Sequence, residues 1–348
     1  GLFFQCEGSV IKKALLTALI PAVAAAIINH LNYNDARTVT FEDFTAEVGS
    51  DTVRASQLWA AMGATLIFLI GFRTNKAYAR FWDGTTLLHQ MWGEWFDAAS
   101  CLVAFTTLSM RDRKDMALDF RHTLVRLTSL MHASALEEIS MTADDEYGYP
   151  SLDIGNLDQS SLQYLKDCKF DKNLNFNRVE VLVHMIQILV VHHHDLGVIK
   201  IPPPILSRVF QTLSRGQVNL ANCKKITTTL FPFPYAQLIA FLLLTYILMT
   251  PVIMACICEK IHWAFIFTLI PIFGLSSLNY VARELEMPFG SDSNDLPLRE
   301  FQEHMNNSML MLIREESDHV AHTSEACDKE WDTAKAGISE KRPKHFLD

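Results

Sequence analysis

The chain has 348 residues, 49% of them apolar and 20% charged, so the apolar residues must be clustered along the sequence. A net charge of -9 argues against the basic surface that binds DNA or RNA, and no nucleic-acid partner is expected. The seven cysteines are scattered without a CxxC pair, which argues against a disulfide framework and a zinc site.

Four apolar runs predict membrane-spanning helices. The sequence carries no charge from Ala14 to Ile28, from Ser56 to Phe72 or from Tyr235 to Cys258, and the run from His262 to Val281 holds only the histidine at its edge. At ~1.5 Å per residue, about twenty helical residues cross a hydrocarbon layer ~30 Å thick. We therefore expect transmembrane helices at about residues 10–32, 56–76, 234–258 and 262–282. For the second run alone, a buried core helix is the alternative.

Basic residues at the ends of these runs predict the topology. The loop of residues 32–55 holds five acidic residues and two arginines. The opposite ends of the spans carry the basic residues Lys12, Lys13, Arg73, Lys76, Arg80, Lys224, Lys225 and Arg283. The positive-inside rule then places both termini and the long segment between the second and third spans in the cytoplasm or its topological equivalent. The spans themselves are compatible with a thylakoid, a plasma membrane or a bacterial inner membrane.

Apolar residues in the long segment recur three and four positions apart, for example within 124–131 and 182–190, which predicts helices. We therefore expect an all-α membrane protein, with residues 1–348 forming one subunit. Its cytosolic helical regions are expected at 77–233 and 283–348, with a charged tail from residue 317 that is only partly ordered.

Four stretches in their order carry a resemblance. They are GFRTNKAYARFWDG (71–84), LSRGQVNLANCKKI (213–226), FPFPYAQLIAF (231–241) and EMPFGSDSNDLPL (286–298). Together they closely resemble the bestrophin family of anion channels, in particular its bacterial and plant or algal branch, from Glu7 to about Leu312. The resemblance implies a homopentamer with four membrane helices per subunit. It also implies a central pore that is lined by the second helix and continues through a helical cytosolic chamber.

Three residues of the second span are expected to form a pore neck. Ala64, Phe68 and Phe72 are spaced i, i+4 and i+8, which places them along one stripe of a helix. Five copies would make apolar rings that gate by dewetting and favour anions that lose water readily. Spacing alone favours packing against neighbouring helices instead, whereas the resemblance aligns the family's neck at these three positions. It likewise implies a second narrowing, a cytosolic aperture at Ile205, with Leu206 as the neighbouring alternative.

A basic stripe continues the same helix, because Arg73, Lys76 and Arg80 are spaced i, i+3 and i+7. These residues could raise the local anion concentration. They could equally pair with acidic residues and hold helices together, and for Arg80 we favour the structural role.

The stretch after the fourth span resembles the calcium clasp of animal bestrophins. Asp292 and Asp295 match acidic positions of that clasp, but Glu284 stands in place of its upstream glutamine and Met287 in place of its asparagine. A thioether is a poor ligand for a hard cation, so calcium is disfavoured and no cofactor or metal is expected. We expect an acidic turn in which Pro288, Phe289 and Gly290 redirect the chain.

The resemblance implies passive conduction of chloride, with bicarbonate and nitrate as further candidates. The sequence carries no GxSxG, P-loop, GxGxxG or HExxH motif, so an enzyme is not expected. A membrane scaffold or regulatory subunit that recruits partners through its cytosolic helices, and conducts little, is the alternative.

Overall fold

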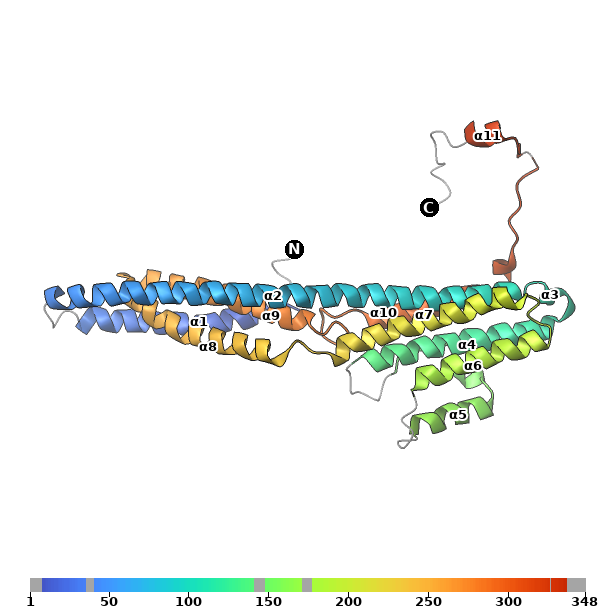
Figure 1. Ribbon diagram of the computed structural model, residues 1–348, viewed down its shortest axis with the longest axis horizontal. Coiled ribbons are helices and arrows are strands. Elements are labelled where there is room, and N and C mark those ends of the chain that lie inside the picture. The colour runs from blue at the N-terminus through green and yellow to red at the C-terminus, as the bar shows by residue number, and fades with distance from the viewer. Residues whose placement is uncertain (1–7, 36–40, 141–147, 171–176, 326, 337–348) are drawn as a thin grey trace.

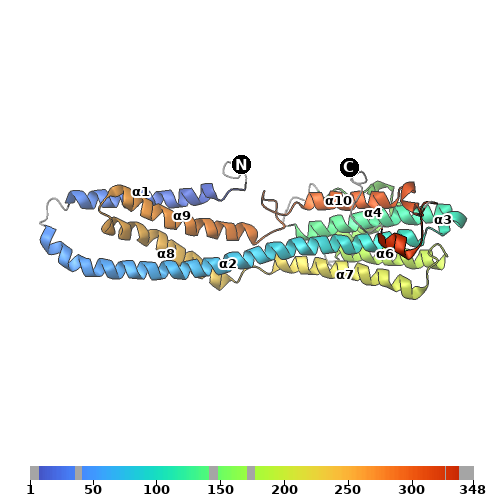
Figure 2. The same cartoon turned by 90° about the horizontal axis from the view of Figure 1, so that it is seen from above.

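The computed structural model describes residues 8–35, 41–140, 148–170, 177–325 and 327–336. Within these ranges the protein is helical and contains no β-strand. Residues 36–40 of the predicted first loop and residues 337–348 of the predicted tail lie outside the described ranges. The helices form an elongated molecule whose two halves share one long helix (Figure 1, Figure 2).

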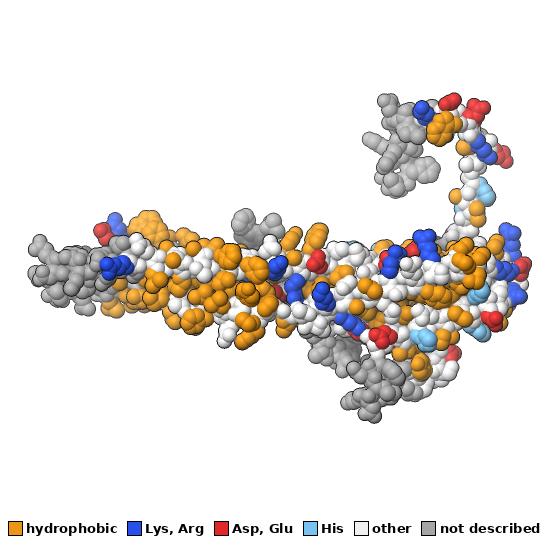
Figure 3. All heavy atoms as spheres, viewed as in Figure 1, with side chains coloured by type: hydrophobic (Ala, Val, Ile, Leu, Met, Phe, Trp, Pro, Cys, Tyr) orange, Lys and Arg blue, Asp and Glu red, His pale blue; other side chains and the backbone are white. Residues whose placement is uncertain are grey.

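The first half is a bundle of apolar helices. Helices α8 (Phe233–Ile257) and α9 (Ile261–Leu285) lie beside the first part of α2 (Phe41–Phe105), and α1 (Ile11–Asp35) packs against α8 and α9 on the side away from α2 (Figure 2). Each of the four includes a stretch long and apolar enough to cross a membrane. Hydrophobic side chains cover most of the visible surface of this half, whereas charged side chains gather on the other half (Figure 3).

The second half packs further helices around the second part of α2. These are α4 (Lys114–Ile139), α6 (Arg178–Asp195), α7 (Pro203–Thr228) and α10 (Leu298–Leu312). Shorter elements complete the described chain, namely α3 (Ser109–Asp112), η2 (Ile154–Asn156), α5 (Gln159–Phe170), η3 (Glu315–Asp318) and α11 (Trp331–Ala336). The helical periodicity predicted at 124–131 and 182–190 therefore falls within α4 and α6.

Helix α2 runs through both halves without a break. Its 65 residues correspond to a length of about 100 Å at ~1.5 Å per residue. The apolar pattern predicted a span at 56–76 followed by a separate helical region, and it did not predict that both belong to one helix. The physical reason is visible in the sequence, because no proline interrupts α2 and its glycines occur singly. The two halves of the molecule are thus connected by one continuous helix.

Two prolines and two asparagines define the ends of neighbouring helices. Helices α7 and α8 begin with proline in their first turn, where the missing N–H has no helical partner to lose. The Asn177 side chain accepts hydrogen bonds from the backbone N–H groups of Val179 and Glu180 and so caps α6. The Asn29 amide of α1 donates to the carbonyls of Ala255 and Cys258, which fixes the end of α8.

Gly216 allows α7 to lie directly against α2 in the core of the second half. Trp95 of α2 is fully buried, and its indole N–H donates to the Leu213 carbonyl at 3.3 Å. A Cβ atom on Gly216 would lie 2.1 Å from Trp95 Nε1. The close packing of these two helices therefore depends on the absence of a side chain at position 216.

A buried polar network joins α10 to α4. His132 is fully buried, and its Nδ1 lies 2.7 Å from Gln302 Oε1. The Gln302 amide donates to the Ser129 carbonyl at 3.2 Å and to Asn306 Oδ1 at 2.9 Å. His132 Nε2 has no hydrogen-bond partner among the described residues. Burial disfavours the charged imidazolium and lowers the pKa of His132 from 6.5 to about 4.

We expect Gly216→Ala to destabilise the protein by about 2 kcal/mol, because the added methyl group must displace the Trp95 ring from its packed position. The measurement is the melting temperature of the purified protein in detergent. Gly93→Ala in α2 is the matched control, since no atom lies within 4 Å of its added Cβ, and it should leave stability unchanged or slightly raised. Equal melting temperatures for both variants would contradict this packing.

We expect His132 to make stability fall as the pH is lowered from about 6.5 towards 4. In that window the unfolded chain binds a proton at this residue and the folded chain does not, so the loss is about 1.4 kcal/mol per pH unit. His132→Gln keeps a donor for Gln302 and should flatten this part of the profile. His122→Gln, which changes an exposed histidine of the same helix, should retain the wild-type slope. Melting curves between pH 7.5 and 5 provide the comparison.

Candidate functional site

The three predicted neck residues lie on a face of α2 that the described chain leaves largely open. Ala64 is exposed, and the ring of Phe68 is 72% exposed. Phe72 is 41% exposed, and its ring centroid lies 6.5 Å from that of Phe231 and 6.1 Å from that of Tyr235. Phe72 thus contacts the junction between α7 and α8, whereas Phe68 projects away from the subunit.

The predicted aperture residue lies in the second half of the molecule, at the end of α7 that is remote from the apolar helices (Figure 1). Ile205 is in the first turn of α7 and is 50% exposed. Its neighbour Leu206 is only 6% exposed and belongs to the core. Of the two alternatives, only Ile205 presents its side chain to the outside of the subunit.

Arg73, the first residue of the predicted basic stripe, is buried and bound. Its guanidinium donates to the two carboxylate oxygens of Glu286 at 2.6 and 2.9 Å and to Asn279 Oδ1 at 3.1 Å. A bidentate contact of this kind fixes the orientation of the carboxylate relative to the guanidinium as well as attracting it. Arg73 therefore holds α2 against the C-terminal end of α9.

Arg80 is also occupied by the protein itself. Its guanidinium donates to the carbonyls of Ile226, Thr229 and Glu286. The first two carbonyls belong to the C-terminal end of α7, where unpaired carbonyls favour a cation. Of the three stripe residues, only Lys76 is exposed, with its ammonium group 5.7 Å from the centre of the Phe72 ring.

The acidic turn after α9 is braced internally. Phe289 is 1% exposed, and a Cβ atom on Gly84 of α2 would lie only 3.0 Å from its ring. The Asp295 carboxylate accepts a hydrogen bond from the Asp292 backbone N–H at 2.7 Å. A Cβ atom on Gly290 would lie 2.5 Å from that carboxylate. Pro288 is buried, and its carbonyl accepts a hydrogen bond from Leu296.

The same turn contacts the start of the chain. The Asn294 amide donates to the Gly8 carbonyl at 2.8 Å, and Glu284 pairs with Lys13 at 3.2 Å. Burial raises the pKa of Asp295 above its usual range. In the described part of the chain no three His, Cys, Asp or Glu side chains are grouped as metal ligands. The arrangement is that of a structural clamp joining the segment before α1, the end of α9 and α2.

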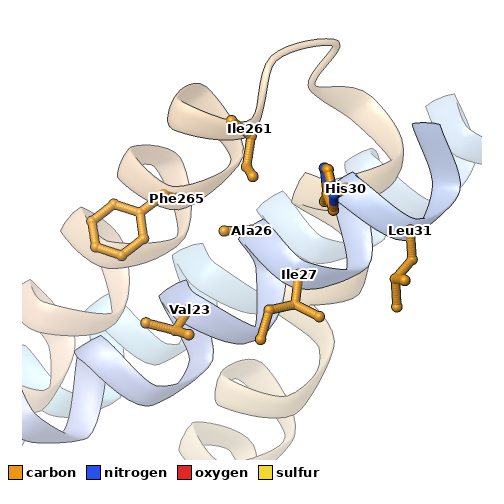
Figure 4. A pocket seen from close by; sticks show the side chains of 7 residues that line it. All are labelled: Val23, Ala26, Ile27, His30, Leu31, Ile261 and Phe265. Carbon is orange, nitrogen blue, oxygen red and sulfur yellow. The ribbon is translucent and has the colours of Figure 1, made fainter. Parts of the chain in front are cut away.

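Hollows of different chemistry open on the described surface. One, of about 240 Å³, lies among apolar side chains of α1 and α9 with His30 at its rim (Figure 4); it is lined by Val23, Ala26, Ile27, His30, Leu31, Ile261 and Phe265. A second, of about 690 Å³, lies between α4, α6 and the η2–α5 segment. The third, of about 390 Å³, lies between α2 and α7 and includes Arg80 and Lys225. The sequence did not predict this third hollow, because its lining residues at 80–87 and 222–229 are more than a hundred positions apart in the chain.

We expect Arg73→Gln to lower the free energy of unfolding by about 3 kcal/mol, because it leaves the Glu286 carboxylate without its charged partner in a largely buried position. Lys76→Gln, one turn further on the same helix and exposed, should change stability by less than about 0.5 kcal/mol. The melting temperatures of both variants test this. If Arg73 served only to attract anions, the two variants would melt alike.

Known proteins resemble this chain in sequence and in fold. The family model described as "Bacterial/Fungal Bestrophin protein" matches residues 1–311. A relative in Synechocystis sp., named a voltage-dependent anion channel-forming protein, is 26% identical over 262 residues, which cover 71% of this chain and 74% of the relative. A relative of the same description in Escherichia coli is 26% identical over 249 residues, covering 69% of this chain and 71% of its own length.

Solved structures share the fold. A crystal structure of a bacterial bestrophin homolog from Klebsiella pneumoniae superimposes with a TM-score of 0.64 at 17% sequence identity, covering 87% of this chain and 98% of that one. The family model covers most of the chain, and the four apolar helices agree with it. This chain is therefore an integral, multi-pass membrane protein that belongs to the bacterial and fungal bestrophin family.

Proposed function

We propose that five copies of this chain assemble around one axis and form a passive anion channel, with Ala64, Phe68 and Phe72 as its neck. The observation that carries the proposal is the 72% exposure of the Phe68 ring in a helix segment that is apolar enough to cross a membrane. A side chain in that position faces either lipid or other copies of the chain. The composition of the exposed face supports the second arrangement.

The exposed residues of α2 differ in composition from those of α8. Between residues 56 and 76 the large apolar side chains Leu58, Ile67, Phe68 and Phe72 alternate with small and polar residues, namely Gln57, Ala61, Ala64, Thr65, Gly71 and Asn75. Helix α8 instead exposes large apolar side chains, namely Phe241, Leu244, Leu248, Met249 and Val252. Polar side chains at membrane depth face protein or water because hydrocarbon cannot satisfy them. This contrast supports a pore-facing α2 and a lipid-facing α8.

Phenylalanine rings at the neck suit the passage of anions. Five apolar side chains around a narrow pore disfavour water in the constriction. Ions do not pass a constriction that is dry, so such a ring acts as a gate. Monovalent anions such as chloride, bicarbonate and nitrate lose their hydration more readily than small cations. The edge of a phenyl ring carries a partial positive charge, which an anion tolerates. The names of the relatives in Synechocystis and Escherichia coli support the same function.

The remaining parts of the chain extend this pathway. The cytosolic half continues the pore as a chamber, and Ile205 narrows its far end. The basic ends of the spans place both termini and this chamber in the cytoplasm or its topological equivalent. The acidic turn at Asp292 and Asp295 acts as a structural clamp and not as a calcium site.

We expect the double variant Phe68→Ala, Phe72→Ala to raise anion conductance several-fold in reconstituted membranes, because the smaller side chains widen and wet the neck. The measurement is single-channel current or vesicle anion flux. Phe241→Ala is the matched control, since this ring is 65% exposed on α8 and should contact only lipid. It should conduct like the wild type.

Three outcomes would contradict the proposal. A wild-type reversal potential that follows the cation gradient would exclude anion selectivity. Wild-type protein without current above background would favour the scaffold alternative. A mass measurement on the solubilised complex that gives two or three subunits would exclude the pentameric pore.

A further inference from the structure

Helix α7 concentrates positive charge in a protein that is acidic overall. The chain carries a net charge of -9, yet the 26 residues of α7 include four basic residues and no acidic one. Two of them are neutralised, because Lys224 pairs with Glu138 and Arg215 pairs with Glu94. None of the ion pairs in the described chain includes Arg208 or Lys225. These two cations are exposed to solvent.

Helix α7 runs antiparallel to α2 and forms a seam with it. Trp95 and Glu94 of α2 contact Leu213 and Arg215, whereas Arg80 contacts the C-terminal end of α7. Both views show the two helices side by side through the cytosolic half (Figure 1, Figure 2). The seam opens at its membrane-proximal end into the hollow of about 390 Å³. The hollow is lined by Arg80, Asp83, Thr86, Leu87, Asn222, Lys225, Ile226 and Thr229.

This hollow lies on the same face of α2 as Phe72, one of the proposed neck residues. Starting at Phe72, steps of four, three, four and three residues lead through Lys76 and Ala79 to Asp83 and Thr86. These steps follow the period of an α-helix, so the five residues share one stripe. If Phe72 faces the pore, Asp83 and Thr86 face the passage on its cytosolic side.

The lining carries a net positive charge and additional hydrogen-bond donors. Arg80 and Lys225 each carry +1 and Asp83 carries -1, so the formal charge of the lining is +1. Asn222 and Thr229 add an amide and a hydroxyl donor. The Thr86 hydroxyl donates to the Trp82 carbonyl at 3.0 Å and offers the hollow only its oxygen. The Arg80 guanidinium is fixed by backbone carbonyls of Ile226, Thr229 and Glu286, and its positive charge therefore stays at the floor of the hollow.

We propose that this hollow is a binding site for a small monovalent anion just below the neck, with Lys225 as its principal cation and Asp83 as the residue that weakens binding. The proposal rests on the channel function proposed above and assigns one of its selectivity sites. Arg80 and Lys225 attract a partly hydrated anion electrostatically. The negative charge of Asp83 weakens this attraction, so that the anion can leave. The sequence suggested an attracting role for the stripe of Arg73, Lys76 and Arg80, and favoured a structural role for Arg80. Both arginines are bound to the protein, so Lys225 supplies an exposed cation beside the exposed Lys76.

Variants of opposite charge test the site. We expect Lys225→Gln to lower the chloride-to-sodium permeability ratio several-fold and Asp83→Asn to raise it several-fold, as measured by reversal potentials in asymmetric NaCl. Arg299→Gln is the control, because it removes an exposed positive charge from α10, outside the seam, and should leave the ratio unchanged. Melting temperatures close to wild type establish that each variant is folded. Unchanged ratios in both seam variants would overturn the proposal.

Bromide provides a readout that does not depend on conduction. Crystals soaked in bromide should show anomalous density in the hollow of the wild type and none in Lys225→Gln. If the wild type conducts anions but the hollow holds no bromide, the site is wrong while the channel function stands. Lysine-dependent bromide density in a protein that does not conduct would retain the site and refute the channel. Density for a lipid phosphate in place of bromide would assign the hollow to a headgroup and overturn the proposal.

Discussion

Glu286 is bound by two arginines of α2, and this contact fixes the geometry at the boundary between the two halves of the molecule. Arg73 holds its carboxylate, and Arg80 holds its backbone carbonyl together with the last carbonyls of α7. Because Glu286 directly follows α9, the contact sets α2, α7 and α9 at one level. The two guanidinium groups donate hydrogen bonds to a carboxylate and to several carbonyls at helix ends. They make a rigid joint where the surroundings of the chain change from apolar to polar.

The continuity of α2 gives this joint its importance. A helix of about 100 Å without a proline transmits orientation along its whole length, so the side chains near Phe68 and those near Thr86 keep a fixed rotational relation. The neck proposed in the membrane half and the anion site proposed in the seam therefore lie on related stripes of one rigid element. Gly216 contributes by allowing α7 to approach Trp95 closely, and this approach creates the seam.

The acidic turn after α9 illustrates how one stretch of sequence supports several chemical interpretations. Proline, phenylalanine and glycine followed by aspartates and an asparagine suit a metal loop, a helix cap or a clamp. In the structure, the Phe289 ring packs against Gly84, which has no side chain. The Asp295 carboxylate accepts a hydrogen bond from the backbone of its own turn, and the Asn294 amide donates to the Gly8 carbonyl. These contacts give the turn a structural role, in which the Asp295 carboxylate accepts a backbone hydrogen bond and the Asn294 amide donates one.

The sequence by itself determined the all-helical class, the four apolar spans and the family, because hydropathy, helical period and motif order are properties of short stretches. It also predicted the face shared by Ala64, Phe68 and Phe72, since i, i+4 spacing needs only the helix to be known. Only the tertiary structure decided which basic residues are free, since the partners of Arg73 and Arg80 lie more than a hundred residues away in the chain. It likewise exposes Ile205 and buries Leu206, and it brings Lys225 and Asp83 to the lining of one hollow. Local pattern encodes which side of a helix a residue occupies, whereas the neighbour on that side is set by how distant helices pack.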